Sequence, residues 1–236
     1  MKQELVYTGR EIEAMDVAVN YHRWILSEFK PYLGKRILEV GAGAGAFSEL
    51  LLETAPDSLT MLEPSSNLYP LLVRRIQSGR THQLTLKEAA PELAGVDSVL
   101  YVNVLEHIED DEAELAAVNS LLPKHGRVLI FVPAHRWLMS EMDRQFGHYR
   151  RYEMAELVRK CQSAGFTIRK AKNFDFFGIA PWLIKFRLMK STEMQSGMIK
   201  LYDDMVVPVA RFLEGLVPPP IGKSILVIAE KGEKSA

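Results

Sequence analysis

The sequence predicts an α/β fold in which helices cover both faces of a mainly parallel sheet. Short β-type runs alternate with helical patterns along most of the chain, which is typical of βαβ units. Several of these runs are almost continuously apolar, as expected for strands buried on both faces. A length of 236 residues fits a single domain, residues 1–236.

The elements can be placed from these patterns. The expected strands are Arg36–Val40, Leu59–Glu63, Leu84–Lys87, Ser98–Asn103, Arg127–Pro133, Thr167–Asn173 and Ser224–Glu230. The expected helices are Glu11–Phe29, Phe47–Glu53, Leu68–Ser78, Asp110–Leu122 and Glu153–Ser163. Acids in the first turn of Asp110–Leu122 complement the helix dipole, and Gly165 marks the end of Glu153–Ser163.

Three segments depart from the simple alternation. Residues 1–30 form an N-terminal helical segment, and residues 134–152 form a loop long enough to act as an active-site lid. Residues 174–220 are apolar, rich in Met and helical in pattern, and we expect a helical insertion before the last strand. This insertion either packs over a ligand site, receives a substrate, meets a membrane surface or simply covers the core.

Composition limits the classes of partner. Lys plus Arg (29) nearly balances Asp plus Glu (30), so no broad cationic field for nucleic acid is expected. The single cysteine, Cys161, permits no disulfide within the chain and reads as a small core residue. Neither a signal peptide nor a transmembrane segment is visible, which predicts a soluble, cytoplasmic protein. The oligomeric state is left open.

The strongest local signal is a glycine-rich turn between a buried strand and a helix. Gly41, Gly43 and Gly45 alternate with alanines directly after Arg36–Val40. Such glycines permit a tight turn and let a ligand approach the backbone closely. The G-x-G-x-G spacing differs from the G-x-G-x-x-G of dinucleotide sites, and the Gly-Lys-Ser/Thr of a P-loop is absent.

Acidic residues accompany this turn at the ends of neighbouring strands. Glu63 lies about twenty residues after the glycines, where an acid accepts hydrogen bonds from ribose hydroxyls. Glu39 lies inside the first strand, which is unusual for a carboxylate unless it is paired. Glu88 follows the third expected strand. The carboxyl ends of these strands should converge on the ligand-binding crevice of an open α/β sheet.

These features resemble the class I S-adenosylmethionine (SAM)-dependent methyltransferases over essentially Tyr21 to Lys231. The resemblance implies a Rossmann-like seven-stranded sheet with the last strand antiparallel, SAM as cofactor and S-adenosylhomocysteine as product. The matching positions are Glu39, Gly41, Gly43 and Gly45 in the first motif, Glu63 with Pro64 at the ribose, Glu88 and Ala89 at the adenine, and Asn103, Val104 and Leu105 beside the methionine end.

A narrower likeness concerns the acceptor. The segments Asn20–Trp24, Gly147–Tyr152 and Pro218–Ser224 resemble a bacterial methyltransferase group often linked to glycosyltransferases. The likeness implies a small-molecule acceptor that is apolar or linked to a saccharide or lipid, methylated on O, N or C. This implication rests on similarity to that group and not on the chemistry of particular residues.

Candidate catalytic residues follow the fourth and fifth strands. His107 lies just past a strand end, and a histidine there has the pKa range of a general base. His135, His148 and Tyr149 lie in the lid-like loop, where Arg150 and Arg151 could grip an anionic acceptor. The alternatives are helix capping for His107 and a salt bridge that anchors the next helix for Arg151.

Two further expectations concern the cofactor and metals. Tyr21 and Trp24 share one face of the N-terminal helix and either close over the sulfonium or pack into the core. Ubiquinone O-methyltransferases, to which the fourth-strand motif is similar, use an acid-x-x-Glu-His pattern for a metal. Asn103 stands at the acid position here, so no metal is predicted.

Two other functions compete with methyl transfer. A nicotinamide-dependent oxidoreductase uses a related sheet, although the glycine spacing counts against it. A methyltransferase-like binding subunit without activity is the non-enzymatic alternative. Methylation of RNA or protein is a further option, but the near-neutral charge weakens the RNA version.

Overall fold

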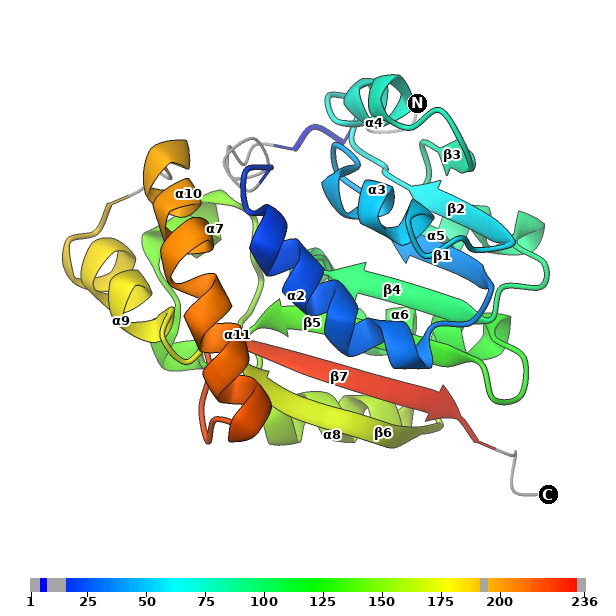
Figure 1. Cartoon of the computed structure of the whole chain (residues 1–236). Helices are drawn as coiled ribbons and strands as arrows, with labels where there is room; N and C mark the ends of the chain where they lie inside the picture. Colours follow the sequence, from blue (N-terminus) through cyan, green and yellow to red (C-terminus); the bar gives the residue numbers. More distant parts are fainter. Residues whose placement is uncertain (1–4, 8–15, 192–194, 233–236) are drawn as a thin grey trace.

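The computed structural model describes residues 5–7, 16–191 and 195–232. In this part of the chain, seven strands form one sheet in the order β3-β2-β1-β4-β5-β7-β6 (Figure 1). Neighbouring strands from β3 to β5 are parallel, and β7 runs antiparallel to both β5 and β6. The strands are β1 (Arg36–Val40), β2 (Ser58–Leu62), β3 (Arg80–His82), β4 (Ser98–Val102), β5 (Arg127–Pro133), β6 (Phe166–Phe174) and β7 (Ser224–Lys231).

Helices cover both faces of this sheet. The core has two parts, one on each face of the sheet. Successive side chains of β5 point to opposite faces and therefore belong to different parts. Leu129 and Phe131 pack with residues of α2, α3 and α11, whereas Val128 and Ile130 pack with residues of α6 and α8. The helices are α2 (Val19–Phe29), α3 (Ala46–Leu52), α4 (Tyr69–Arg75), α5 (Leu86–Ala89), α6 (Asp111–Leu121), α7 (Glu141–Gln145), α8 (Met154–Ser163), α9 (Ile179–Trp182), α10 (Ser196–Met205) and α11 (Val207–Leu216).

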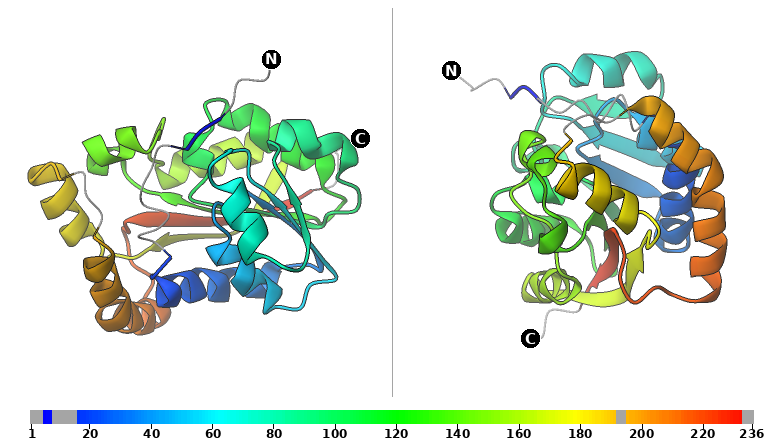
Figure 2. Two further views of the ribbon diagram at one scale, coloured as in Figure 1. Left: turned by 90° about the horizontal axis from the view of Figure 1, so that it is seen from above. Right: turned by 90° about the vertical axis from the view of Figure 1, so that its left-hand side faces the viewer.

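The expected helical insertion lies between β6 and β7. It contains α9, a π-helical turn over Leu183–Leu188, α10 and α11. Figure 2 shows α10 and α11 along the outer side of α2, which itself lies on the sheet. None of the helices in the described ranges has the length and apolarity that crossing a bilayer requires.

The third strand was predicted at the wrong place. It is Arg80–His82, which pairs with Thr60–Leu62, and not Leu84–Lys87. Thr85 instead caps α5: its hydroxyl accepts from the Glu88 backbone N–H, and the Glu88 carboxylate accepts from the Thr85 backbone N–H. This capping box makes helix the favoured conformation after Thr85.

The N-terminal helix also differs from its expected bounds. It begins at Val19 rather than Glu11. Residues 11–15 lie outside the described part of the chain, and Asp16–Ala18 are not helical. The helix after β2 ends at Arg75 instead of Ser78, and the remaining predicted elements agree with the structure to within a few residues.

Candidate active site

The glycine turn has a backbone conformation that favours glycine. The φ angles of Gly41, Gly43 and Gly45 are +70°, +57° and +87°, in the region that L side chains rarely adopt. At Gly41, a Cβ atom would lie 2.6 Å from Cγ2 of Val104. The turn is tied to the second strand, because the Gly41 N–H donates to the Leu62 carbonyl at 2.8 Å.

Glu63, directly after β2, contacts the glycine turn through hydrogen bonds. Its carboxylate accepts from the Gly43 N–H at 2.8 Å and from the Ser65 N–H at 2.9 Å. A carboxylate has about four acceptor positions, so both oxygens keep capacity for further donors such as ribose hydroxyls. Glu63 and Pro64 both line the cavity described below, together with Gly41 and Gly43.

Glu39 is a buried carboxyl group at the base of the same region. It is 3% exposed and accepts a hydrogen bond from the Ser48 hydroxyl at 2.5 Å. Burial raises the pKa of Glu39 to about 8, an effect that the Ser48 hydrogen bond opposes and the charge of Glu63 reinforces. The group is therefore mainly protonated at neutral pH.

A cavity of about 670 Å³ opens above these groups. This volume falls within the roughly 300–1,000 Å³ of typical ligand pockets. It runs from the glycine turn to the loop of residues 134–152. The predicted residues that line it are Tyr21, Glu39, Gly41, Gly43, Glu63, Pro64, Asn103, Val104, His107, His148 and Tyr149.

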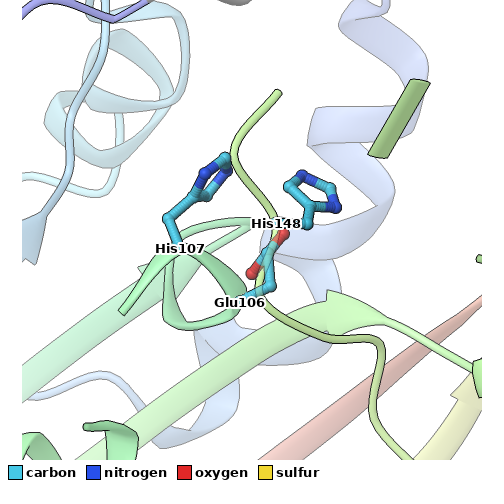
Figure 3. Close-up of side chains that lie close together, drawn as sticks. All are labelled: Glu106, His107 and His148. Carbon is cyan, nitrogen blue, oxygen red and sulfur yellow. The ribbon is translucent and has the colours of Figure 1, made fainter. Parts of the chain in front are cut away.

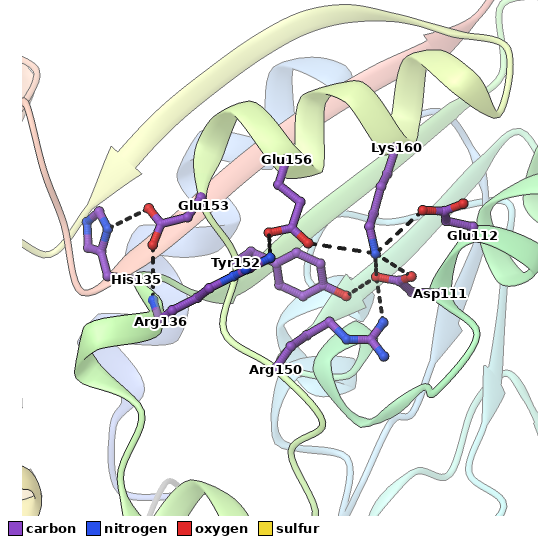
Figure 4. A network of polar contacts seen from close by, with 9 residues as sticks. All are labelled: Asp111, Glu112, His135, Arg136, Arg150, Tyr152, Glu153, Glu156 and Lys160. Carbon is purple, nitrogen blue, oxygen red and sulfur yellow. Dashed lines mark hydrogen bonds and ion pairs between the residues drawn. The ribbon is translucent and has the colours of Figure 1, made fainter.

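Several predicted residues are placed elsewhere. Trp24 is buried and packs on Phe174 with ring centroids 3.9 Å apart, so it belongs to the core. His135 directs Nδ1 to the Glu153 carboxylate at 3.1 Å (Figure 4). Gly45, Glu88, Ala89, Leu105 and His135 are not among the residues that line the cavity.

Other lining residues were not predicted. Leu84, Thr85 and Leu86 occupy the wall where Glu88 and Ala89 were expected, because the third strand ends earlier than predicted. The sequence pattern Thr85-x-x-Glu88 is a capping box and could have revealed this. Tyr7 comes from a distant segment for which the sequence carries no local signal, whereas Trp182 belongs to the insertion that was expected either to cover the core or to receive a substrate.

Glu106, His107 and His148 come together at the far end of the cavity (Figure 3). The two imidazole rings are perpendicular, with centroids 4.5 Å apart. Glu106 is fully buried, and neither of its oxygens has a hydrogen-bond partner in the described ranges. Burial raises the pKa of Glu106 to about 7, while burial and the nearby His148 lower the pKa of His107 to about 3.

Internal ion pairs hold the loop that carries His148. Its Nδ1 lies 3.1 Å from Oδ1 of Asp143, which also accepts from the buried Arg151 at 2.8 and 2.9 Å. Burial alone would raise the pKa of Asp143, but the hydrogen bond from His148 and the charge of Arg151 bring it below its ordinary value. Arg151 therefore balances a carboxylate of its own chain, although it also borders the cavity.

Arg150 belongs to a second network (Figure 4). Its guanidinium lies 2.8 Å from Asp111, which also accepts from the Tyr152 hydroxyl and the Lys160 ammonium at 2.7 Å. These contacts join the end of the loop to α6 and α8. The predicted arginine pair thus anchors the loop, and neither guanidinium is without a partner carboxylate.

Residues 16–171 match the family described as "Methyltransferase domain". The chain belongs to this methyltransferase family. The ubiquinone biosynthesis O-methyltransferase of Aeromonas salmonicida is 24% identical over 188 residues, which cover 72% of this chain and 78% of that protein.

Solved methyltransferases share the fold. A SAM-dependent methyltransferase from Archaeoglobus fulgidus superposes with a TM-score of 0.58 at 17% identity, covering 87% of this chain and 91% of the other. Magnesium protoporphyrin IX methyltransferase from Synechocystis PCC 6803, solved with bound SAM, gives 0.54 at 14% identity, covering 93% and 80%. At such identities these structures support the fold alone.

The family match makes the chain a SAM-dependent methyltransferase, and the solved structures show that it has the class I fold. The predictions of fold, enzyme class and cofactor are confirmed, and the nicotinamide alternative is set aside. The site fits the cofactor on two observations of its own: the glycine turn at Gly41 and Gly43 lines the cavity, and the Glu63 carboxylate, which has acceptor capacity left, borders the same cavity.

Proposed function

We propose that this methyltransferase binds SAM at the glycine end of the cavity and methylates an acceptor bound below residues 134–152. The observation that carries the proposal is the continuity of one cavity from Gly41 and Glu63 to His107 and His148. In this arrangement, Glu63 accepts from the ribose, Asn103 and Val104 border the methionine end, and Leu84–Leu86 border the adenine.

Methyl transfer needs little covalent chemistry from the protein. Bound SAM would supply an activated methyl group, which the acceptor nucleophile would receive while the carbon–sulfur bond electrons remain with S-adenosylhomocysteine. Holding the reactants in line contributes up to roughly 7–11 kcal/mol. His107, His148 and Tyr149 are the residues that we assign to the acceptor end.

His107 is the proposed acceptor of the proton that a hydroxyl or ammonium acceptor loses. Its lowered pKa keeps the imidazole neutral, and therefore able to accept a proton, throughout the physiological range. A base with so low a pKa is weak, because general bases work best near the operating pH. Positioning is therefore expected to supply more of the rate than proton transfer.

An apolar stripe on the insertion favours a lipid-linked acceptor. The residues follow one another at helical spacing on the outer side of α10 and α11, and each is more than half exposed. They are Met198, Leu201, Met205, Val209, Phe212 and Leu216. Exposed apolar surface of this kind marks an interaction site.

The charges around this stripe suit an anionic membrane surface. Arg187, Lys190, Lys200 and Arg211 are exposed in the same insertion, whereas Asp204 is the only exposed acid among residues 174–191 and 195–220. Amphipathic helices with basic residues bind membrane surfaces by apolar burial together with attraction to anionic lipids. We propose that the insertion lies on the membrane that carries the acceptor.

The test compares acceptors with and without a lipid tail. Transfer of labelled methyl from SAM is measured to a saccharide–polyprenyl lipid in anionic vesicles and to the same headgroup without its tail. We expect a much higher kcat/KM for the lipid. The Phe212→Asp and Leu216→Asp double variant should lose vesicle binding and this preference while binding S-adenosylhomocysteine normally.

Val73→Asp is the matched control, since Val73 is exposed on α4, away from the insertion. Equal kcat/KM for both acceptors, or vesicle binding that survives the double substitution, would contradict the lipid proposal.

A further inference from the structure

We infer that Glu106, His107 and His148 form a binding site for a divalent transition-metal ion. One ligand atom from each residue lies within 4.8 Å of the other two. Ion–ligand distances of about 2.0–2.2 Å require these atoms to be roughly 3.4 Å apart in a tetrahedral site. The present separations exceed this spacing by about 1.4 Å at most, a difference that changes in side-chain torsion can close.

The carboxylate of Glu106 is the main evidence for a missing partner. It is fully buried in the described structure, and neither oxygen accepts a hydrogen bond from another residue. A buried polar group without a partner destabilises the folded state, so natural proteins rarely keep one without a role. Figure 3 shows the carboxylate below the two imidazole rings, where an ion would contact all three groups.

His148 has the supporting contact that metal-binding histidines usually have. Its Nδ1 faces the Asp143 carboxylate at 3.1 Å, which fixes the ring and leaves Nε2 for a ligand. Metal-bound histidines commonly pair their second nitrogen with a carboxylate in this way. Asp143 is itself held by Arg151 and Ser140, so the ring orientation is set by a rigid network.

The donor set indicates the class of metal. Two imidazole nitrogens and one carboxylate oxygen suit Zn²⁺, Fe²⁺, Co²⁺ or Mn²⁺, whereas Mg²⁺ and Ca²⁺ prefer oxygen ligands. The prediction of no metal considered only the fourth-strand motif, in which Asn103 removes a carboxylate. His148 on the loop supplies a different third ligand.

All three residues line the cavity, which leaves the remaining coordination positions open to it. If the proposed function holds, an acceptor oxygen would occupy one of them. A bound ion would lower the pKa of an acceptor hydroxyl, and in the metal-bound enzyme His107 would hold the ion instead of accepting the proton itself. The metal site itself does not depend on the identity of the acceptor.

The test is a titration of metal-free protein with Co²⁺, followed by its visible absorption, and with Zn²⁺ in competition. We expect one ion per chain. Glu106→Gln and His148→Ala should each weaken Co²⁺ binding about 100-fold or more, since loss of an outer contact alone weakens binding about 10–100-fold. His125→Ala is the matched control, because His125 does not line the cavity and its Nδ1 lies 3.1 Å from the Glu230 carboxylate.

Binding of S-adenosylhomocysteine shows that each variant is folded and keeps its cofactor site. Co²⁺ affinity that is equal in wild type, Glu106→Gln and His148→Ala would overturn the inference, as would a wild type that binds no Co²⁺. Since no acceptor is present, this result is independent of whether the lipid proposal survives.

Discussion

Replacement of Glu39 by Gln should stabilise the ligand-free protein at alkaline pH and have little effect in acid. The side chain is 3% exposed and its pKa is raised to about 8, mainly by burial, from an ordinary value of 4.5. The unfolded chain therefore releases this proton at a lower pH than the folded chain. Gln keeps the shape of the side chain and does not titrate.

Proton linkage determines the sign and size of the stability difference between Glu39→Gln and the wild type. Between about pH 4.5 and 8 the folded state holds the extra proton, so the stability of the wild type falls as the pH rises through this range. Each unit of pKa difference corresponds to about 1.36 kcal/mol. The advantage of Glu39→Gln is thus expected to grow from near zero at pH 4.5 to roughly 4 kcal/mol at pH 8.

The assay is urea unfolding of both proteins at several pH values without SAM. Because every other group titrates in both chains, the difference between the two free energies of unfolding isolates Glu39. A difference that stays constant with pH, or one that favours the wild type increasingly as the pH rises, would refute the assignment of a neutral, buried Glu39.

Three further substitutions test the site. Gly43→Val should abolish binding of S-adenosylhomocysteine in calorimetry, because a φ of +57° disfavours a β-branched residue. Gly197→Val is the control, since a side chain at this helix position would meet open space. Binding that survives in Gly43→Val would show that the turn is not part of the cofactor site. Asp143→Ala should lower the free energy of unfolding by about 3–5 kcal/mol in urea, since it leaves the buried Arg151 without this carboxylate. A decrease of less than about 1 kcal/mol in the free energy of unfolding would contradict that role. His107→Ala should lower kcat much more than the affinity for S-adenosylhomocysteine, with His125→Ala as control; unchanged kcat would exclude His107 from the reaction.

Much of the fold could be predicted because it depends on local signals. The apolar runs of β1, β4 and β5 and the acids that begin α6 are visible without knowledge of their neighbours. The third strand was misplaced because local patterns do not reveal it. Arg80–His82 is short and polar, and it is a strand only because it pairs with β2, which lies about twenty residues earlier in the sequence.

The two ends of the cavity also differ in how far local sequence signals reveal them. The cofactor end is built from strand ends and the turn that follows β1, so Gly41, Glu63 and Asn103 could be located from their distance to predicted strands. The acceptor end combines Glu106 with His148 from a loop whose path is set by ion pairs to Asp143 and Asp111. In the sequence, Glu106 matches the Glu of an acid-x-x-Glu-His metal pattern whose first acid is replaced by Asn103, and no local signal places His148 beside it. Only the folded chain shows it buried beside two imidazoles and without a hydrogen-bond donor, which is why a motif read along the strand predicted no metal and the three-dimensional arrangement supports one.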